Sequence, residues 1–166
     1  MLFRSEKILL LRNHGLRNRD NVEILGYNSR LDTFQAVVGN WLLPQAKSIS
    51  DKRIDNAKYL DLGLSKIKGI RIPKRYTNMR SVFHLYSVFA EQRDSLLDFC
   101  LSSGVEAKVH YPIPIYRQKA LKTLAQGQSF PVSDELADIS ITFPCDQHLR
   151  KEDLNEIIDV VADFYS

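Results

Sequence analysis

The hydrophobic pattern of this chain changes its period after Gly69, and no other feature of the sequence constrains the fold more strongly. Before that glycine, apolar residues recur at three- and four-residue spacing, which is typical of amphipathic helices. After it, aromatic and β-branched residues gather in short runs, which favours strands that alternate with helices. The chain is therefore predicted to be an α+β protein, in which two long helices precede a small sheet.

The first part of the chain is predicted to be helical apart from one loop. Asp32 opens an amphipathic helix that Pro44 should interrupt, because proline cannot continue the hydrogen-bond ladder. A second long helix is expected from about 49 to 64. A short helix is expected at 6–12, and residues 13–29 are predicted to form a loop.

The second part is predicted to hold three strands and four helices. Aromatic and β-branched residues mark the expected strands at 81–90, 105–111 and 139–143. Helical spacing marks the expected helices at 93–101, 116–124, 133–139 and 151–165. Gly104 is the predicted left-handed cap that ends the first of these helices, and Ser133 is the predicted N-cap of the third. The strands would form a small antiparallel or mixed sheet with the helices packed against it.

Charge is distributed unevenly along the chain. Residues 1–80 contain 16 Lys and Arg against 7 Asp and Glu, whereas residues 81–166 contain 7 against 13. A basic first half suggests an anionic partner such as a phosphate-bearing ligand, and a solvated pair of basic helices is the alternative. The basic residues are dispersed and lack interleaved aromatic residues or a zinc-knuckle pattern, so no nucleic-acid partner is expected.

Several classes of protein are excluded by what the sequence lacks. It has no run of about 18 apolar residues and no signal-peptide pattern, so neither a membrane span nor export is expected. Cys100 and Cys145 are too few for a disulfide scaffold, which favours a reducing cytoplasm, and both are predicted to be buried. The four histidines lie far apart and at no metal-ligand spacing, so no metal site is predicted.

Three short polar segments could carry chemistry. Residues 26–30 place an amide, a hydroxyl and a guanidinium side by side before a helix, which suits a phosphate, unless Asn28 and Ser29 only cap that helix. His110 and Tyr111 stand at a predicted strand end, where ligands often bind, although such a corner also serves packing. Residues 13–15 are predicted to be the C-cap of the short helix.

These segments, in this order, resemble the DegT/StrS family of sugar aminotransferases. The similarity covers nearly the whole chain and is carried by residues 11–15, 25–36, 52–53, 59, 109–114, 130–137, 143–144 and 149–154. The resemblance implies the C-terminal part of a pyridoxal-phosphate enzyme of the aspartate-aminotransferase fold type. Residues 1–48 would then supply a dimer-arm loop and the first long helix, and residues 49–166 the small domain.

The resemblance also implies that this chain lacks a catalytic residue of its own. In the family, the lysine that forms the Schiff base lies shortly before the segment matching residues 12–15. None of the 11 lysines of this chain occupies that position. Pyridoxal phosphate reacts through its carbonyl group. It needs the lysine amine, which the amino group of the substrate then replaces in the bond to that carbonyl carbon. The lysine is therefore expected upstream of Met1.

Two pairs of site residues are implied by the resemblance. Asn28 matches an asparagine that reaches across a dimer interface to the phosphate of the neighbouring subunit's pyridoxal phosphate, and Arg30 belongs to the same cofactor-binding loop. His110 and Tyr111 match a corner near the sugar-nucleotide side of the substrate pocket. Phe34 and residues 39–41 depart from the family's pattern. These departures concern the packing of the long helix.

Three hypotheses about function follow. The first is a portion of an aminotransferase that moves an amino group, with glutamate as the expected donor, to a keto sugar nucleotide in polysaccharide or amino-sugar biosynthesis. It would act as a homodimer or with a complementing large-domain half, and would be inactive alone. The second is a non-catalytic assembly module that pairs through an apolar face containing Phe34 and Trp41. The third is a regulatory or dehydratase branch of the same superfamily. The choice of that branch depends on whether the missing catalytic residue is Lys or His.

Overall fold

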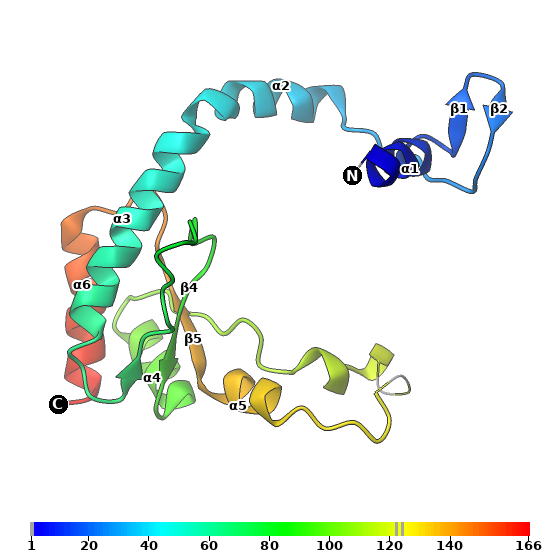
Figure 1. Cartoon of the computed structure of the whole chain (residues 1–166). Helices are drawn as coiled ribbons and strands as arrows, with labels where there is room; N and C mark the ends of the chain where they lie inside the picture. The colour runs from blue at the N-terminus through cyan, green and yellow to red at the C-terminus, as the bar shows by residue number, and fades with distance from the viewer. Residues whose placement is uncertain (1, 122, 124) are drawn as a thin grey trace. The chain divides into compact units, whose positions relative to one another are not determined.

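The computed structural model describes residues 2–121, 123 and 125–166 (Figure 1). The chain forms two compact units, of which the first ends at Ala46 and the second spans Lys47–Ser166. Among the described residues, no helix combines the length and the apolar character needed to cross a membrane.

The first unit contains a helix, a small hairpin and a second helix. Helix α1 (Leu2–Arg12) is followed by strands β1 (Leu16–Asn18) and β2 (Asn21–Val22), which pair antiparallel. The prediction of a plain loop at 13–29 is therefore wrong at the residues that form β1 and β2. Such short strands carry too few residues for a periodic signal, and their register depends on a turn rather than on alternation.

Helix α2 (Thr33–Leu42) begins where the sequence predicted. The Asp32 carboxylate accepts a hydrogen bond of 2.8 Å from the backbone N–H of Phe34, which makes Asp32 the N-cap. Pro44 lies in the 3₁₀ turn η1 (Leu43–Gln45), so the predicted interruption is confirmed. The long helix α3 (Ala46–Leu64) follows it and starts three residues earlier than expected.

The second unit is built on a three-stranded antiparallel sheet in the order β3–β4–β5. Strand β3 is Ile70–Arg71, β4 is Tyr86–Ala90 and β5 is Ser140–Phe143. The predicted strand at 105–111 is wrong, because this segment makes only an isolated bridge between Lys108 and Thr142. The third strand is β3 instead, which the sequence analysis missed.

Three helices besides α3 pack on this sheet: α4 (Arg93–Ser102), α5 (Pro131–Ile139) and α6 (Lys151–Phe164). Gly104 has φ +86°, which confirms the predicted left-handed cap after α4. Ser133 is not the N-cap of α5, because that helix already begins at Pro131, a residue whose missing N–H is tolerated in the first turn.

The predicted helix at 116–124 is replaced by two 3₁₀ turns, η2 (Ile115–Arg117) and η3 (Lys119–Leu121). Residues 122 and 124 of that prediction lie outside the described part of the chain.

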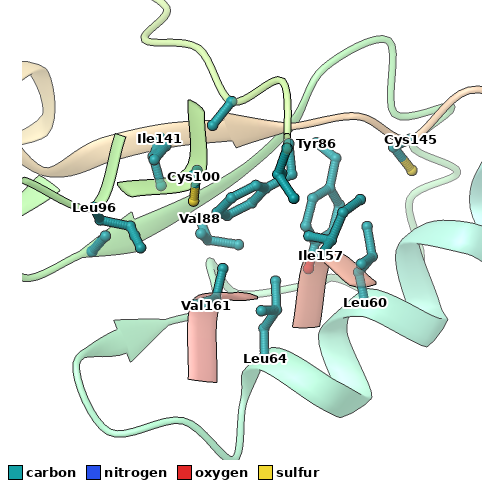
Figure 2. Packing of buried hydrophobic residues seen from close by; sticks show 14 of the residues in the cluster. Leu60, Leu64, Tyr86, Val88, Leu96, Cys100, Ile141, Cys145, Ile157 and Val161 are labelled. Atoms are coloured by element: carbon teal, nitrogen blue, oxygen red, sulfur yellow. The ribbon is translucent and has the colours of Figure 1, made fainter. Parts of the chain in front are cut away.

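The core of the second unit lies where α3, α4 and α6 meet the sheet (Figure 2). Its fully buried side chains include Leu60, Leu64, Tyr86, Val88, Leu96, Ile141 and Val161. Helices α3 and α6 approach closely at Gly63, where an added Cβ would lie 2.3 Å from the Cδ1 atom of Ile158. Glycine at this position therefore lets the two helices close over the core.

Both cysteines belong to this core, as the sequence predicted. Cys100 and Cys145 are buried free thiols, and burial raises the pKa of each thiol to about 11. Since the thiolate is the reactive form, neither cysteine is a nucleophile near neutral pH.

A polar network crosses the edge of the core. The buried Tyr86 hydroxyl donates to Asp61 at 2.8 Å, and the Arg75 guanidinium donates two hydrogen bonds of 3.0 Å to the same carboxylate. Burial and the hydrogen bond to Asp61 raise the pKa of the Tyr86 hydroxyl well above its usual range. Asp61 thus satisfies the polar groups of two residues that would otherwise lack a partner beside the core.

Candidate functional site

The loop that carries Asn28 is held against the end of α1 by main-chain hydrogen bonds. The N–H of His14 donates to the carbonyl of Tyr27 at 2.9 Å, and that of Ser29 donates to the carbonyl of Arg12, also at 2.9 Å. Asn13 and Asn28 form an antiparallel bridge between these two contacts. Asn28 therefore stands on a backbone that is fixed on both sides.

The backbone of this region requires glycine at Gly15. His14 and Gly15 have φ values of 58° and 74°, and the Gly15 N–H donates to the carbonyl of Leu10 at 2.7 Å, which confirms the predicted C-cap. An added Cβ at Gly15 would lie 1.7 Å from the carbonyl oxygen of Ile24. Only glycine allows the segment after β2 to approach the end of α1 this closely.

The side chains of Asn28 and Arg30 lie together on the surface. Both residues are exposed, and the Arg30 Nε donates to the Asn28 Oδ1 at 3.4 Å. Neither residue caps α2, because Asp32 fills that role. The alternative in which Asn28 and Ser29 only start the helix is therefore wrong, and both Asn28 and Arg30 keep N–H groups that can be directed at an anion.

Next to this pair, arginines gather around a hollow of about 650 Å³ between α1 and β1. Arg12, Arg17 and Arg30 line it, together with Glu6. Arg17 makes a bidentate ion pair with the Glu23 carboxylate, with both hydrogen bonds 2.8 Å long. The hydrogen bond from Arg17 lowers the pKa of the Glu23 carboxyl. Arg12 and Arg30 thus add positive charge near Asn28, which suits the phosphate end of a cofactor.

His110 and Tyr111 lie beside the end of β5 in the second unit. The His110 Nδ1 is 3.2 Å from the Thr142 Oγ1, and Thr142 in turn lies 3.3 Å from the Ser87 Oγ. The rings of His110 and Tyr111 meet edge to face, with centroids 5.5 Å apart. Strand β5 thus fixes the imidazole, while the Tyr111 side chain remains 73% exposed.

A pocket of about 440 Å³ opens at these two residues. One wall is the segment from His110 to Gln118, and the other is formed by α5 and the start of β5, including Ser133 and Ser140. This volume lies in the range of small-molecule sites, and most of the lining is apolar with a few polar groups. Tyr111 and the side chains of Ser133 and Gln118 can offer hydrogen bonds to a polar ligand such as a sugar.

A carboxylate that the sequence analysis did not identify holds the two walls together. The Tyr116 hydroxyl donates to both oxygens of Asp134 at 2.6 Å, and the Arg117 guanidinium lies 2.7 Å from the same carboxylate. The Tyr116 ring also packs on Phe130, with centroids 5.0 Å apart. No local pattern marks this contact, because 18 positions separate Tyr116 from Asp134.

We expect Asp134→Asn to loosen the pocket wall without unfolding the second unit. A hydrogen bond to a charged group stabilises by roughly 1.5–3 kcal/mol, so amide hydrogen exchange at residues 115–121 should rise at least about tenfold. Glu135→Gln is the matched control, since its contact with Arg71 is 3.7 Å long and both side chains are exposed. Equal exchange rates in the two variants would mean that Asp134 does not hold the wall.

The two pairs of predicted site residues belong to different compact units, Asn28 and Arg30 to the first and His110 and Tyr111 to the second. Among the described residues, no group of three or more His, Cys, Asp or Glu could hold a metal ion.

Helix α2 presents an apolar surface to solvent. None of its residues is buried, and Phe34, Val37 and Trp41 are 76%, 62% and 68% exposed. The expected exposure of Phe34 and Trp41 is therefore confirmed within the first unit. A helix with such a surface ordinarily packs against a partner.

Comparison with known proteins agrees with the resemblance in the sequence. Residues 4–162 match the DegT/DnrJ/EryC1/StrS aminotransferase family. The chain is 32% identical to the erythromycin biosynthesis sensory transduction protein EryC1 of Saccharopolyspora erythraea, over 93% of this chain and 42% of that protein. It is 30% identical to the dTDP-3-amino-3,4,6-trideoxy-alpha-D-glucose transaminase of Streptomyces venezuelae, over 96% of this chain and 42% of that protein.

This chain shares its fold with part of a solved structure. The crystal structure of DesV from S. venezuelae, in complex with a ketimine intermediate, superposes with a TM-score of 0.91 and 30% identity. The superposition covers 98% of this chain and 44% of the DesV chain. The chain thus spans less than half the length of the proteins that it matches.

Proposed function

Because the chain belongs to the DegT/DnrJ/EryC1/StrS aminotransferase family, we propose that it forms the C-terminal part of an enzyme that transfers an amino group to a keto sugar nucleotide. Residues 1–48 would supply the dimer-arm loop and the first long helix, and residues 49–166 the small domain. The relative from Streptomyces venezuelae is a transaminase named for a dTDP-linked amino sugar, which supports a nucleotide-sugar substrate and a place in amino-sugar biosynthesis. The cytoplasm is the proposed location. Glutamate is the proposed amino donor.

The observation that carries this proposal is the fixed loop at Asn28. Main-chain hydrogen bonds on both sides hold its backbone, while the Asn28 amide and the Arg30 guanidinium remain exposed. We infer that these two side chains bind the phosphate of pyridoxal phosphate in a neighbouring subunit or in a complementing large-domain half. When bound, this cofactor supplies the carbonyl group that accepts and releases the amino group.

The residues of the first unit fit the phosphate end of the cofactor. Asn28, Arg30 and Arg12 offer donors and positive charge. The amine that the cofactor carbonyl requires would come from the complementing part of the enzyme. His110 and Tyr111 would orient the sugar nucleotide in the pocket beside α5.

Asn28→Ala is expected to weaken cofactor retention in an enzyme rebuilt from this chain and a large-domain half. Loss of the amide contact with a charged phosphate should raise the dissociation constant of pyridoxal phosphate by about tenfold or more. Cofactor absorbance after gel filtration measures this retention, and Asn18→Ala, at an exposed asparagine of the hairpin, is the control. Unchanged retention in an active rebuilt enzyme would show that Asn28 does not bind the phosphate.

Borohydride trapping with pyridoxal phosphate on the purified chain tests whether a catalytic amine is present. Intact mass should show no adduct, or scattered labelling below one per chain. A single stoichiometric adduct on one lysine would contradict the proposal that the catalytic lysine lies in another part of the enzyme.

A second function, a non-catalytic assembly module, is favoured by one observation, which is the exposed apolar surface of α2. Such a module would associate normally when Asn28 is replaced and would never retain the cofactor. The rebuilt-enzyme experiment therefore separates the two functions.

A further inference from the structure

A hollow of about 470 Å³ lies between α3 and the segment that joins β3 to β4. Ile54 and Lys58 line it from α3, and Lys74, Tyr76, Met79 and Arg80 line it from the connecting segment. It shares no lining residue with the pocket at His110. We call this hollow the α3 groove.

The connecting segment is fixed to α3 at three points. Arg75 binds Asp61 through two hydrogen bonds of 3.0 Å, and Arg80 donates to Asp51 at 2.7 Å. Farther along, the Arg53 guanidinium donates to the carbonyls of Phe83 and His84 at 2.6 Å and 2.7 Å. The groove is therefore formed before any ligand binds, which lowers the conformational cost of binding.

The groove and its ion-pair partners carry an excess of positive charge. The cations are Lys47, Lys58, Lys74, Arg75 and Arg80, and the carboxylates within contact of them are Asp51, Asp55 and Asp61. All three carboxylates already have a cationic partner, so the excess is two positive charges. Lys58 has only a 3.6 Å contact with Asp55, with both side chains exposed, so its ammonium remains available to an anion.

Aromatic surface lies beside this charge. Tyr76 is 52% exposed and Met79 is 67% exposed, and both line the groove. The Lys74 ammonium stands 4.9 Å from the centroid of the Tyr76 ring. This contact holds the Lys74 ammonium over one face of the ring, and the exposed part of the ring remains available for stacking.

From this combination we propose that the α3 groove binds a nucleoside phosphate. A phosphate group near neutral pH carries between one and a half and two negative charges, roughly matching the excess of two positive charges. Lys58 and Lys74 would contact the phosphate, and the base would stack on Tyr76 next to Met79. This proposal does not depend on the proposed transamination.

Free nucleotides and the nucleotide portion of a larger substrate share this chemistry. The experiment uses UDP with the full, isotope-labelled chain and follows backbone amide shifts. We expect saturable shifts at residues 74–83 that weaken as salt is raised. Uridine and inorganic pyrophosphate should each bind at least about tenfold more weakly than UDP, since each lacks one of the two contacts.

Lys74→Gln and Tyr76→Ala should each weaken UDP binding, by about threefold or more for the lysine and about tenfold for the ring. Lys151→Gln, at an exposed lysine of α6, is the control for general loss of positive charge and should bind UDP as the unmodified chain does. Circular dichroism confirms that each variant is folded.

Several results would overturn the proposal: no UDP binding, shifts confined to residues 110–118, or equal binding of UDP and pyrophosphate with no effect of Tyr76→Ala. UDP-N-acetylglucosamine distinguishes the two sources of ligand. Added shifts at His110 and Tyr111 would identify the nucleotide as part of a substrate, whereas shifts in the α3 groove alone would identify a free nucleotide. Because these are binding measurements, their failure is separate from failure of the proposed transamination.

Discussion

Replacing Leu60 by alanine is expected to lower the free energy of unfolding of the second unit by about 3–4 kcal/mol. The Leu60 side chain is fully buried in the core against the sheet (Figure 2). Removing its outer atoms loses their transfer free energy and leaves a cavity that fixed helices and strands fill only in part. A loss of this size is a large fraction of the stability of an ordinary domain.

Leu62→Ala is the matched control for Leu60→Ala. It is the same substitution on the same helix, but the Leu62 side chain is 68% exposed. Alanine has the higher helix propensity, so the change at Leu62 should stay within about 0.5 kcal/mol. Urea denaturation followed by circular dichroism measures both variants. Equal losses would mean that the core is not where these helices and strands place it.

Asp61→Ala is expected to cost about 2–3 kcal/mol, because it leaves the buried Tyr86 hydroxyl without its acceptor. It also removes the partner of Arg75, whose guanidinium lies over the rings of Phe83 and Tyr86 at 5.1 Å and 5.5 Å. A donor that is shielded from water cannot recover its hydrogen bond from solvent. The same denaturation measurement reports the loss.

Asp51→Ala is the control for Asp61→Ala. Asp51 lies on the same helix and pairs with Lys47 and Arg80, but all three side chains are substantially exposed. Surface pairs of this kind contribute less than about 1 kcal/mol. The double variant Asp61→Ala with Tyr86→Phe should regain part of the loss, because it removes the unsatisfied hydroxyl. No recovery would show that the cost comes from Arg75 instead.

The local elements could be predicted from the sequence wherever a short stretch carries its own signal. Helices α2, α4 and α6 follow from the three- and four-residue spacing of apolar side chains, and Asp32 and Gly104 mark two of their ends. Each of these signals lies within one helical turn of the residue that it fixes. Their positions were therefore predicted to within a few residues.

Strand pairing could not be predicted in the same way. Residues 105–111 have the composition of a strand, yet Lys108 pairs with Thr142 at a single bridge. In contrast, Ile70 and Arg71 form a strand only because β4 offers its edge to them. β-propensity describes a fit to a half-buried surface, and the neighbouring strand decides whether that surface exists.

The candidate site, too, could be predicted from the sequence only in part. The sequence placed an amide and a guanidinium at Asn28 and Arg30, and the family resemblance assigned them to a phosphate. The tertiary structure decided that both side chains stay exposed, and that Asp134 closes the wall beside His110.

What the sequence determined by itself was the α+β class, most of the helices and the family. The tertiary structure alone decided the sheet order, the Asp61 and Asp134 networks, and the gathering of lysines beside Tyr76. The physical reason is separation along the sequence, because propensity and capping act between residues only a few positions apart. In contrast, Asp61 meets Tyr86 across 25 positions, and only a folded chain brings them within hydrogen-bond distance.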